Sequence, residues 1–401
     1  MHNISLSLSY LRHSITATLL NIITFGAGIA LIVALLLTNA QLQNEFTKNL
    51  DGIDLVVGGK GSPMQLILSS VFHLDIPTGN IPLTEADTIR KHPLIKSAIP
   101  IALGDNYNGF RIVGTNSLYI DHYHGQLAQG RFFATPMEAV IGSDVAAKYQ
   151  LQLNAELVGA HGLSNSDDLH SDFPYRITGI LAPTHTLLDR LVLTPVESVW
   201  HVHEHPDPDD AEEVAHKKEH PGKEITALLI TYKSPYAAVV LPRLVNNSSS
   251  MQAASPAFEV ARLTSFMGLG TDTLLSMGWF LIALAGLGIF AGLYRAMDER
   301  RYDLALMRSF GAPPSRLFAL IVTESCLTAL IGACLGILLG HLAVEAFGAW
   351  IASSKHIHIT GALFLPEEAF LLLAALLIGL VAAIIPAFKI YRLDIASTLI
   401  R

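Results

Sequence analysis

The chain has 401 residues, of which 51% are hydrophobic and 15% are charged, and its mean hydropathy is +0.43. This composition excludes an ordinary water-soluble globular protein, in which about 25% of residues are charged. The net charge of −8 at pH 7 argues against nucleic acid as a partner, because phosphate backbones bind basic surfaces.

Four segments are apolar enough and long enough to cross a bilayer. Asp, Glu, Lys and Arg are absent from 13–44, 273–294 and 369–388, and 317–343 contains only Glu324 among these types. About 20 apolar residues cross the roughly 30 Å hydrocarbon core as a helix. We therefore predict four transmembrane helices, the first within 1–40 and the others at 273–295, 317–348 and 368–388.

The first apolar segment, 16–38, has a second interpretation as a cleaved signal peptide, because it is N-terminal and follows Arg12. It is longer than the apolar core of about 7–15 residues that such signals carry, and the Asn-Ala-Gln sequence at 39–41 is a poor cleavage site. We favour an uncleaved membrane anchor.

Basic residues predict the orientation, since short loops rich in Lys and Arg stay in the cytoplasm. Arg295 and the segment 296–316 together hold a cluster of arginines, whereas the loop 349–367 holds only Lys355. Both termini, including the tail 389–401, are therefore expected to be cytoplasmic. Residues 41–272 then form a large domain on the other side of the membrane, inserted between helices 1 and 2.

The pattern of this outer domain is that of an α+β fold. Short β-type runs separated by glycine, proline or asparagine occur at 54–57, 111–113, 139–141, 175–178 and 227–232. Helices are predicted at 84–90 and 143–149, with Thr84 and Ser143 as N-caps. The flanking segments 41–50 and 255–271 are predicted to form a helical stalk.

The outer domain contains no cysteine, because Cys326 and Cys334 both fall in the third apolar segment. Disulfides therefore do not stabilise it, and its own apolar core must do so. Residues 58–62 (Gly-Gly-Lys-Gly-Ser) lack the spacing and the Lys-Ser or Lys-Thr pair of a phosphate-binding loop. We expect no cofactor in this chain, so any ATP and Mg²⁺ would be bound by a separate chain.

Histidines are concentrated in a stretch rich in Asp, Glu and Pro, at His201, His203, His205, His216 and His220. Imidazole is the commonest ligand of Zn²⁺, so one interpretation is a zinc-binding loop. The other is a solvated loop with incidental metal affinity, since its low apolar content prevents packing. The same His-x-His spacing recurs at His122/His124 and His356/His358.

The third apolar segment carries two further patterns. Gly332, Gly336 and Gly340 recur every four residues and predict a smooth face for close helix packing, within the chain or between two chains. Gly288 and Gly292 offer a second such face on the preceding span. Glu324 is interpreted either as a proton-coupling carboxylate or as a group near the cytoplasmic interface that pairs with a basic residue or simply reaches water.

The segment 299–312 (Glu-Arg-Arg-Tyr-Asp-Leu-Ala-Leu-Met-Arg-Ser-Phe-Gly-Ala) resembles the cytoplasmic loop of the FtsX-like permease family, which includes MacB-type exporters and LolC/LolE lipoprotein-release subunits. The following Arg316-Leu-Phe and Glu324-Ser325 agree with it. Residues 7–12 resemble the family's N-terminal amphipathic helix, and 386–394 its ending. The order of one span, a large outer domain and three further spans extends the resemblance over the whole chain.

The resemblance implies a type VII ABC transporter of the bacterial inner membrane. This chain would be a non-enzymatic permease subunit without a fused ATPase, paired with a second permease chain as a homodimer and with two cytoplasmic ATPase chains. ATPase closure would be transmitted through 296–316 to the periplasmic domain, which moves or extracts a substrate together with a periplasmic or outer-membrane partner. We call this process mechanotransmission.

The resemblance also implies how the ATPase is contacted. Four apolar side chains would enter an ATPase groove, Asp303 and Arg308 would lie at its rim, and Gly311 and Ala312 complete the motif. The apolar side chains are Leu304, Leu306, Met307 and Phe310. The alternative is an amphipathic helix resting on lipid headgroups.

Two other functions remain open. In the first, the chain is a regulatory transmembrane scaffold that controls a periplasmic enzyme, as cell-division members of the family do. In the second, it serves metal uptake or sensing through 201–220. The large size of the outer domain favours transport over the scaffold.

Overall fold

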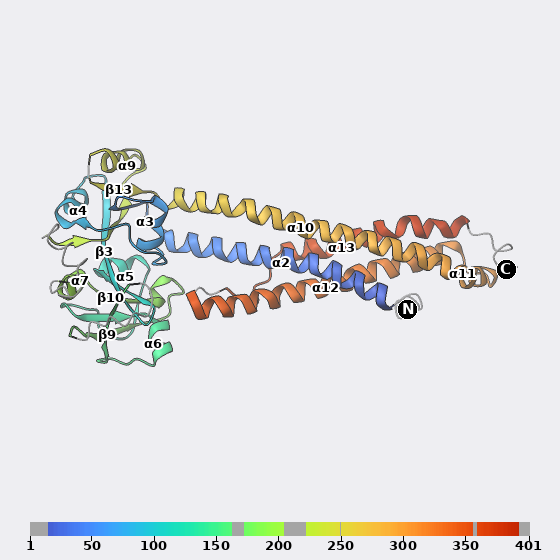
Figure 1. Ribbon diagram of the computed structural model, residues 1–401, viewed down its shortest axis with the longest axis horizontal. Helices are drawn as coiled ribbons and strands as arrows, with labels where there is room; N and C mark the ends of the chain where they lie inside the picture. The colour runs from blue at the N-terminus through green and yellow to red at the C-terminus, as the bar shows by residue number, and fades with distance from the viewer. Residues whose placement is uncertain (1–14, 163–171, 204–221, 249, 356–358, 393–401) are drawn as a thin grey trace. The chain divides into compact units, whose positions relative to one another are not determined.

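The computed structural model of the chain describes residues 15–162, 172–203, 222–248, 250–355 and 359–392 (Figure 1). The chain divides into two compact units. We call Met1–Gln43 together with Ser265–Arg401 the helical unit, and Asn44–Thr264 the sheet unit.

The helical unit contains long helices that lie side by side and the short helix α11 (Figure 1). They are α2 (Ile15–Leu50), α10 (Pro256–Glu299), α11 (Arg301–Ser309), α12 (Pro314–Lys355) and α13 (Glu367–Lys389), followed by the 3-10 turn η2 (Ile390–Arg392). Within the described part of the chain, 4 helices, namely α2, α10, α12 and α13, are long and apolar enough to cross a membrane. The last residues of α2 and the first of α10 belong to the sheet unit.

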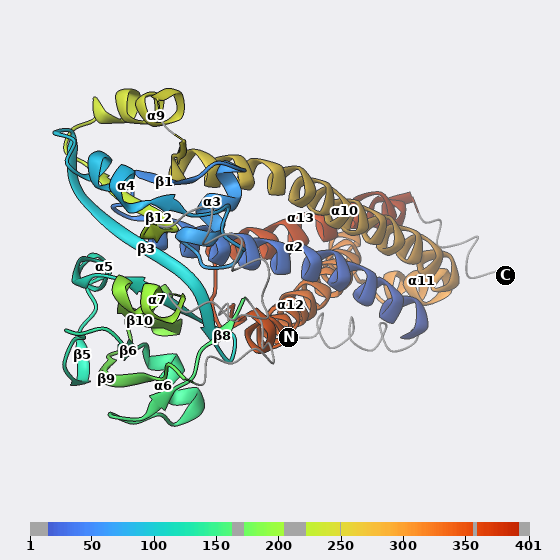
Figure 2. The same ribbon diagram turned by 60° about the vertical axis from the view of Figure 1, so that its left-hand side comes forward.

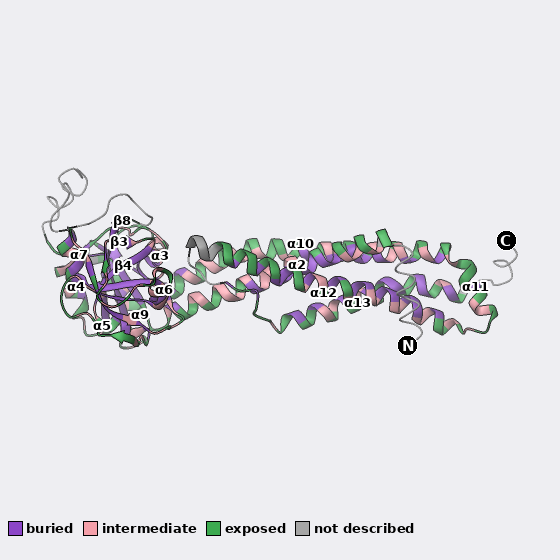
Figure 3. Ribbon diagram, turned by 90° about the horizontal axis from the view of Figure 1, so that it is seen from below, coloured by how far each residue is buried: buried purple, intermediate pink, exposed green. Residues whose placement is uncertain are grey.

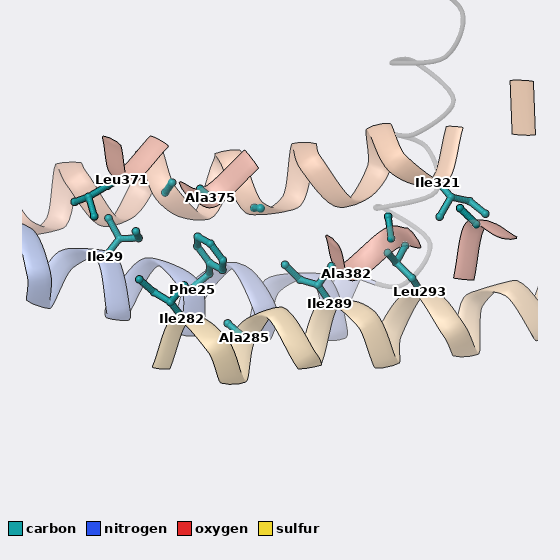
Figure 4. Close-up of a cluster of buried hydrophobic side chains, with 14 of the residues drawn as sticks. Phe25, Ile29, Ile282, Ala285, Ile289, Leu293, Ile321, Leu371, Ala375 and Ala382 are labelled. Carbon is teal, nitrogen blue, oxygen red and sulfur yellow. The ribbon is translucent and has the colours of Figure 1, made fainter. Parts of the chain in front are cut away.

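Each of these helices buries one face in a shared core. Phe25 and Ile29 of α2, Ile282 and Ile289 of α10 and Leu371 of α13 belong to one buried cluster between the helices (Figure 4). Figure 3 shows buried and exposed residues alternating along the helices. The exposed positions include large apolar side chains on α10 and α13, as expected for faces that meet lipid. These side chains are Phe280, Leu287, Phe370 and Leu377.

Glycines allow α12 to approach α2 closely. A Cβ added at Gly336 would lie 2.6 Å from the carbonyl oxygen of Gly26 and 2.6 Å from Cβ of Ile29. The predicted glycine face of the third span therefore packs against α2 of the same chain. Gly332 and Gly340 face Phe25 and Val33 in the same way, and Gly288 faces Asn21.

The sheet unit contains short helices and many strands. The strands are β1 (Leu55–Gly59), β2 (Ile81–Pro82), β3 (Ile95–Tyr107), β4 (Phe110–Thr115), β5 (Leu127–Gly130), β6 (Glu138–Ile141), β7 (Glu156–Leu157), β8 (Ala160–His161), β9 (Tyr175–Leu181), β10 (Leu191–Pro195), β11 (Glu224–Ile225), β12 (Ala227–Tyr232) and β13 (Met251–Ala254). The helices are α3 (Pro63–Ser70), α4 (Leu83–Arg90), α5 (Ser117–His122), α6 (Ser143–Tyr149), η1 (Leu187–Arg190), α7 (Val196–His203) and α9 (Ala237–Ser248).

The main sheet is mixed, with the strand order β13-β1-β12-β3-β4-β10-β6-β9-β5. Strands β4 and β10 pair in parallel, as do β6 and β9, and the other neighbours on this path are antiparallel. The long strand β3 joins the two halves, because its first part pairs with β12 and its second part with β4 (Figure 2). The predicted α+β class is confirmed.

Both faces of the sheet are covered by apolar cores. On β1, Val56 joins one core with Leu66 of α3, whereas Leu55 and Val57 join the opposite core with Leu241 of α9. Successive residues of a strand point to opposite faces, so a central strand buried on both sides is apolar throughout. The unit therefore has an apolar core of its own without any disulfide.

The helices expected at 84–90 and 143–149 are present, but their predicted N-caps are wrong. Helix α4 has Pro82 as its N-cap and α6 has Gly142, and neither receives a side-chain cap. A Cβ at Gly142 would lie 2.2 Å from the carbonyl oxygen of Leu188. Contact with η1, which comes later in the chain, therefore requires glycine at this position.

We predict that Gly336→Ala lowers the thermal unfolding temperature of the full chain in detergent, because its methyl group would press on the backbone of α2. Overpacking of this kind costs about 1–3 kcal/mol. The matched control is Gly270→Ala on α10, where nothing lies within 4 Å of the added Cβ. This control should be neutral or stabilising, since alanine favours helix by about 1 kcal/mol over glycine. Equal unfolding temperatures for both variants would contradict the close packing.

Acid should destabilise the sheet unit through His73. Burial first, and then the Arg111 guanidinium, lower the pKa of His73 from 6.5 to about 3, and its Nε2 lies 2.9 Å from Tyr119 Oη. Between these two pH values the unfolded chain binds a proton that the folded chain does not. The contribution of His73 to the free energy of unfolding is therefore fully present above pH ~6.5. It falls by about 1.4 kcal/mol per pH unit as the pH decreases toward 3.

The variant that tests this prediction is His73→Asn, because asparagine tolerates the left-handed backbone at this position (φ 56°) and does not titrate. Thermal unfolding at pH 7 and pH 4.5 should show a smaller acid-induced loss in the variant than in the parent chain. An identical loss would remove His73 as its source.

Candidate coupling site

Helix α11 follows α10 after a single residue, Arg300, which has φ −100° and ψ 13°. Hydrogen bonds continue across this bend: the Arg300 N–H donates to the Ala296 carbonyl at 3.0 Å, and the Leu304 N–H donates to the Arg300 carbonyl at 3.0 Å. The two helices are thus joined by a hydrogen-bonded corner.

The C-terminus of α11 is closed by a Schellman motif. The Gly311 N–H donates to the Arg308 carbonyl at 3.0 Å, the Ala312 N–H donates to the Met307 carbonyl at 3.0 Å, and Gly311 has a left-handed φ of +92°. Pro313 cannot continue the helix, and Pro314 begins α12. The Gly-Ala ending of the motif therefore sets a defined turn between α11 and α12.

The side chains of α11 divide into two groups. Leu304 and Ala305 are buried in the core of the helical unit, whereas Phe310 is 82% exposed and Leu306 37% exposed. Met307 is partly buried against the same core. Leu304 is thus an internal contact rather than part of the exposed surface. Asp303 is exposed and Arg308 is partly exposed.

One exposed residue was not selected from the sequence. Tyr302 is 56% exposed and lies four residues before Leu306, which lies four before Phe310. Residues four apart lie on one face of a helix, so these three side chains form a row along α11 and its C-cap residue Phe310. We call them the apolar row. Their i, i+4 spacing was the signal that identifies Tyr302.

A groove of about 340 Å³ lies beside the C-terminal end of α11. Phe310 borders it, Arg316 contributes a positive charge, and the remaining wall is mainly apolar. The wall residues include Met307, Ala312, Leu317 and Leu320. The exposed side chains of the apolar row and this groove therefore lie next to each other on one part of the helical unit.

Ion pairs connect this region to the helices. Arg300 Nη1 lies 3.2 Å from Glu324 Oε2, and both side chains are largely buried. Lys389 Nζ lies 2.9 Å from Asp298 Oδ1 and 4.0 Å from the ring centroid of Tyr294. Of the two interpretations of Glu324, pairing with a basic residue is therefore observed. The beginning of α11 is tied to α12, and the end of α13 to α10.

The predicted histidine loop is mostly outside the described residues, which exclude His205, His216 and His220. His201 lies exposed on α7, with its ring centroid 5.4 Å from that of Phe173, and His203 ends this helix. Within the residues that the structure covers, no three His, Cys, Asp or Glu side chains are grouped to hold a metal ion. Zinc binding by the loop stays a prediction.

The other His-x-His pairs differ in their placement. His122 and His124 both border a pocket of about 420 Å³, together with Lys48 and Asp51. Burial lowers the pKa of His122 from its ordinary value. His356 and His358 lie outside the described residues.

Two family profiles match the chain: "FtsX-like permease C-terminal" over 275–395 and "MacB-like periplasmic core domain" over 18–238. Among solved structures, the periplasmic region of MacB from Actinobacillus actinomycetemcomitans is 12% identical, with a TM-score of 0.34, covering 54% of this chain and 97% of that one. The extracellular domain of the noncanonic ABC-type transporter YknZ from Gram-positive bacteria is 14% identical, with a TM-score of 0.30, covering 51% and 99%. A search of curated protein sequences gives no match.

The second profile spans more than half of the chain, and the first covers α10 from residue 275 onward together with α12 and α13. The chain belongs to the FtsX-like permease family and carries a MacB-like periplasmic core domain. This confirms the resemblance identified in 299–312. Members of the family are membrane-embedded permease subunits of ABC transporters and are not themselves catalytic.

We predict that Glu324→Gln destabilises the chain, because it leaves the Arg300 charge buried without its carboxylate. Removing one partner of a buried pair costs about 3–5 kcal/mol. The double variant Arg300→Met/Glu324→Met should recover most of this loss in thermal unfolding. As a control, Arg295→Gln, which removes an exposed ion pair with Glu299, should change little. If the single and double variants lose the same stability, the pair does not stabilise the corner.

Proposed function

We propose that this chain is the permease subunit of a type VII ABC transporter, and that it carries movement from a separate ATPase across the bacterial inner membrane to a periplasmic domain. The observation that carries this proposal is the apolar row of α11, exposed on a helix that is firmly attached to the membrane bundle. Family membership supports an assembly with an ATPase. The substrate is a molecule moved or extracted in the periplasm.

The apolar row fits a contact with the ATPase. In the proposed orientation it faces the cytoplasm, where leaving large apolar side chains in water is unfavourable by about 25 cal/mol per Å². Binding energy at protein interfaces is concentrated in a few such aromatic and aliphatic side chains. Phe310 and Leu306 would enter the ATPase groove, Asp303 and Arg308 would contact its rim, and Leu304 would hold α11 in place from inside. Headgroup binding by α11 is the alternative.

The corner between α10 and α11 favours transmission of this movement. The Arg300–Glu324 pair and the buried Leu304 tie α11 to the bundle, so a push on α11 displaces α10 and α12 rather than bending a loop. Helix α10 is continuous from Pro256 to Glu299, and its first residues belong to the sheet unit. A continuous helix conveys displacement along its axis because each turn is hydrogen-bonded to the next.

The remaining parts of the proposal concern topology and assembly. The arginines around 296–316 support cytoplasmic termini and a sheet unit in the periplasm, inserted between the first and second transmembrane helices. A second copy of the chain would complete a homodimer, and ATP and Mg²⁺ would be bound by two ATPase chains. A periplasmic or outer-membrane protein would receive the substrate. Zinc binding at 201–220 would add a metal-dependent step to this transport.

We predict that Phe310→Ser combined with Leu306→Ser lowers ATP hydrolysis stimulated by the permease about tenfold or more in a reconstituted complex, since hot-spot truncations cost about 2 kcal/mol or more. Membrane insertion should be unchanged, because both side chains are exposed. The matched control is Tyr236→Ser, an aromatic residue of the sheet unit that is 67% exposed. Full stimulation by the double variant would refute the assigned contact.

A further inference from the structure

The loop between α12 and α13 is bound by side chains from three helices of the helical unit. Its described part begins at Ile359, and α13 begins at Glu367. Gln41 of α2 makes two hydrogen bonds with Thr360: its Nε2 donates to the Thr360 carbonyl and its Oε1 accepts from the Thr360 N–H, both at 2.9 Å. Glu345 of α12 accepts from the Gly361 N–H at 2.7 Å. The loop thus bridges α2 and α12.

The backbone of this loop lies directly on α12. A Cβ added at Gly361 would lie 2.1 Å from the carbonyl oxygen of His341, and one added at Gly348 would lie 1.8 Å from the carbonyl oxygen of Ile359. Only glycine fits at either position. Such close contact leaves the loop little freedom to shift while its hydrogen bonds persist.

His341 is the buried residue at the centre of this arrangement, with Glu368 of α13 beside it. Only 8% of His341 and 6% of Glu368 are exposed. One ring nitrogen, Nδ1, contacts the Gly361 carbonyl, and the other, Nε2, lies 3.1 Å from Glu368 Oε2. The second oxygen of Glu368 accepts the Leu365 N–H at 2.9 Å.

Counting donors and acceptors fixes the number of protons in this network. A carbonyl and a carboxylate both accept, so an imidazole between them must donate from both nitrogens. A neutral imidazole has only one N–H. Therefore either His341 is an imidazolium or Glu368 carries the proton and donates to Nε2. In both arrangements the pair holds one more proton than a neutral histidine beside a carboxylate.

We propose that His341 and Glu368 form a site for a single proton, and that this proton holds the loop 359–366 as a clamp joining α2, α12 and α13. Loss of the proton would place the Nε2 lone pair against a carboxylate oxygen or leave the Gly361 carbonyl without its donor. An unmade hydrogen bond of this kind in a buried place is unfavourable by about 1–3 kcal/mol. The clamp would then open and free α2 from α12 at this end.

The charged groups around the ring are few among the described residues. Glu368 is the carboxylate in contact with it, and Glu345, one helical turn further along α12, is engaged with the loop backbone. Glu367 of α13 is exposed, and α2 contributes the neutral Gln41. The ring of Phe364 covers the imidazole, with 4.5 Å between the ring centroids. The proton therefore depends mainly on one carboxylate.

The site is distant from the coupling site. His341 is 27 residues after Pro314 on one helix (341 − 314), which corresponds to about 40 Å at about 1.5 Å per residue. In the proposed orientation the clamp faces the periplasm, and only this placement depends on the proposed function. A proton bound there would set how tightly the helices are joined where movement leaves the bundle.

Hydrogen exchange of the full chain in lipid nanodiscs tests the proposal without any ATPase. Backbone exchange of 359–366 is measured between pH 5.5 and 9 and corrected for the intrinsic dependence of exchange on pH. We expect protection to fall about tenfold or more as the pH rises, as a loss of 1.4 kcal/mol corresponds to tenfold in an equilibrium. Protection that is constant over this range would overturn the proposal.

Two variants of adjacent carboxylates form the matched pair. Glu368→Gln can donate to Nε2 and still accept the Leu365 N–H, so it should hold the loop closed at every pH. Glu367→Gln, its exposed neighbour, should keep the pH dependence of the parent chain. His341→Phe removes both bonds and should leave the loop unprotected throughout. If Glu368→Gln responds to pH as the parent does, the proton site lies elsewhere and the inference is wrong.

Discussion

The close approach of α12 to α2 along Gly332, Gly336 and Gly340 is the contact on which the helical unit depends. In a bilayer, apolar side chains gain little by leaving lipid for one another, so helices associate through close backbone packing and polar contacts. The glycine face provides the first. Two buried polar contacts, Arg300 with Glu324 and His341 with Glu368, provide the second, and their α12 residues lie 17 positions apart (341 − 324).

The proposed transmission of movement depends on two connections within this arrangement. The Schellman turn and the Arg300–Glu324 pair fix α11 to the bundle, so that its apolar row is presented on a rigid support. At the other end of α12, the loop 359–366 joins α2 to α12 through Gln41 and Glu345. The proposed function needs both connections. A force on α11 displaces the other helices only if α11 is rigidly attached to them, and the displacement is conveyed further only if the helices are also joined at the other end.

Some features followed directly from the sequence. In the hydrocarbon core every backbone N–H and C=O group must be hydrogen-bonded within the protein, so long uncharged apolar runs predict helices. The short β-type runs in 41–272 predicted the α+β class. Other features depended on distant contacts. The start of α6 depends on the close contact of Gly142 with η1, and the glycine face of α12 packs against α2 rather than against another helix. The burial of Leu304 could not be predicted because apolar residues occur on both sides of α11.

The central claim is that ATP-driven movement enters at α11 and reaches the sheet unit. The most direct test is hydrogen exchange of the reconstituted complex, without nucleotide and with a non-hydrolysable ATP analogue that closes the ATPase. Transmitted movement would alter exchange both in 301–309 and within 44–264. A change confined to α11, with exchange in 44–264 the same in both states, would contradict it.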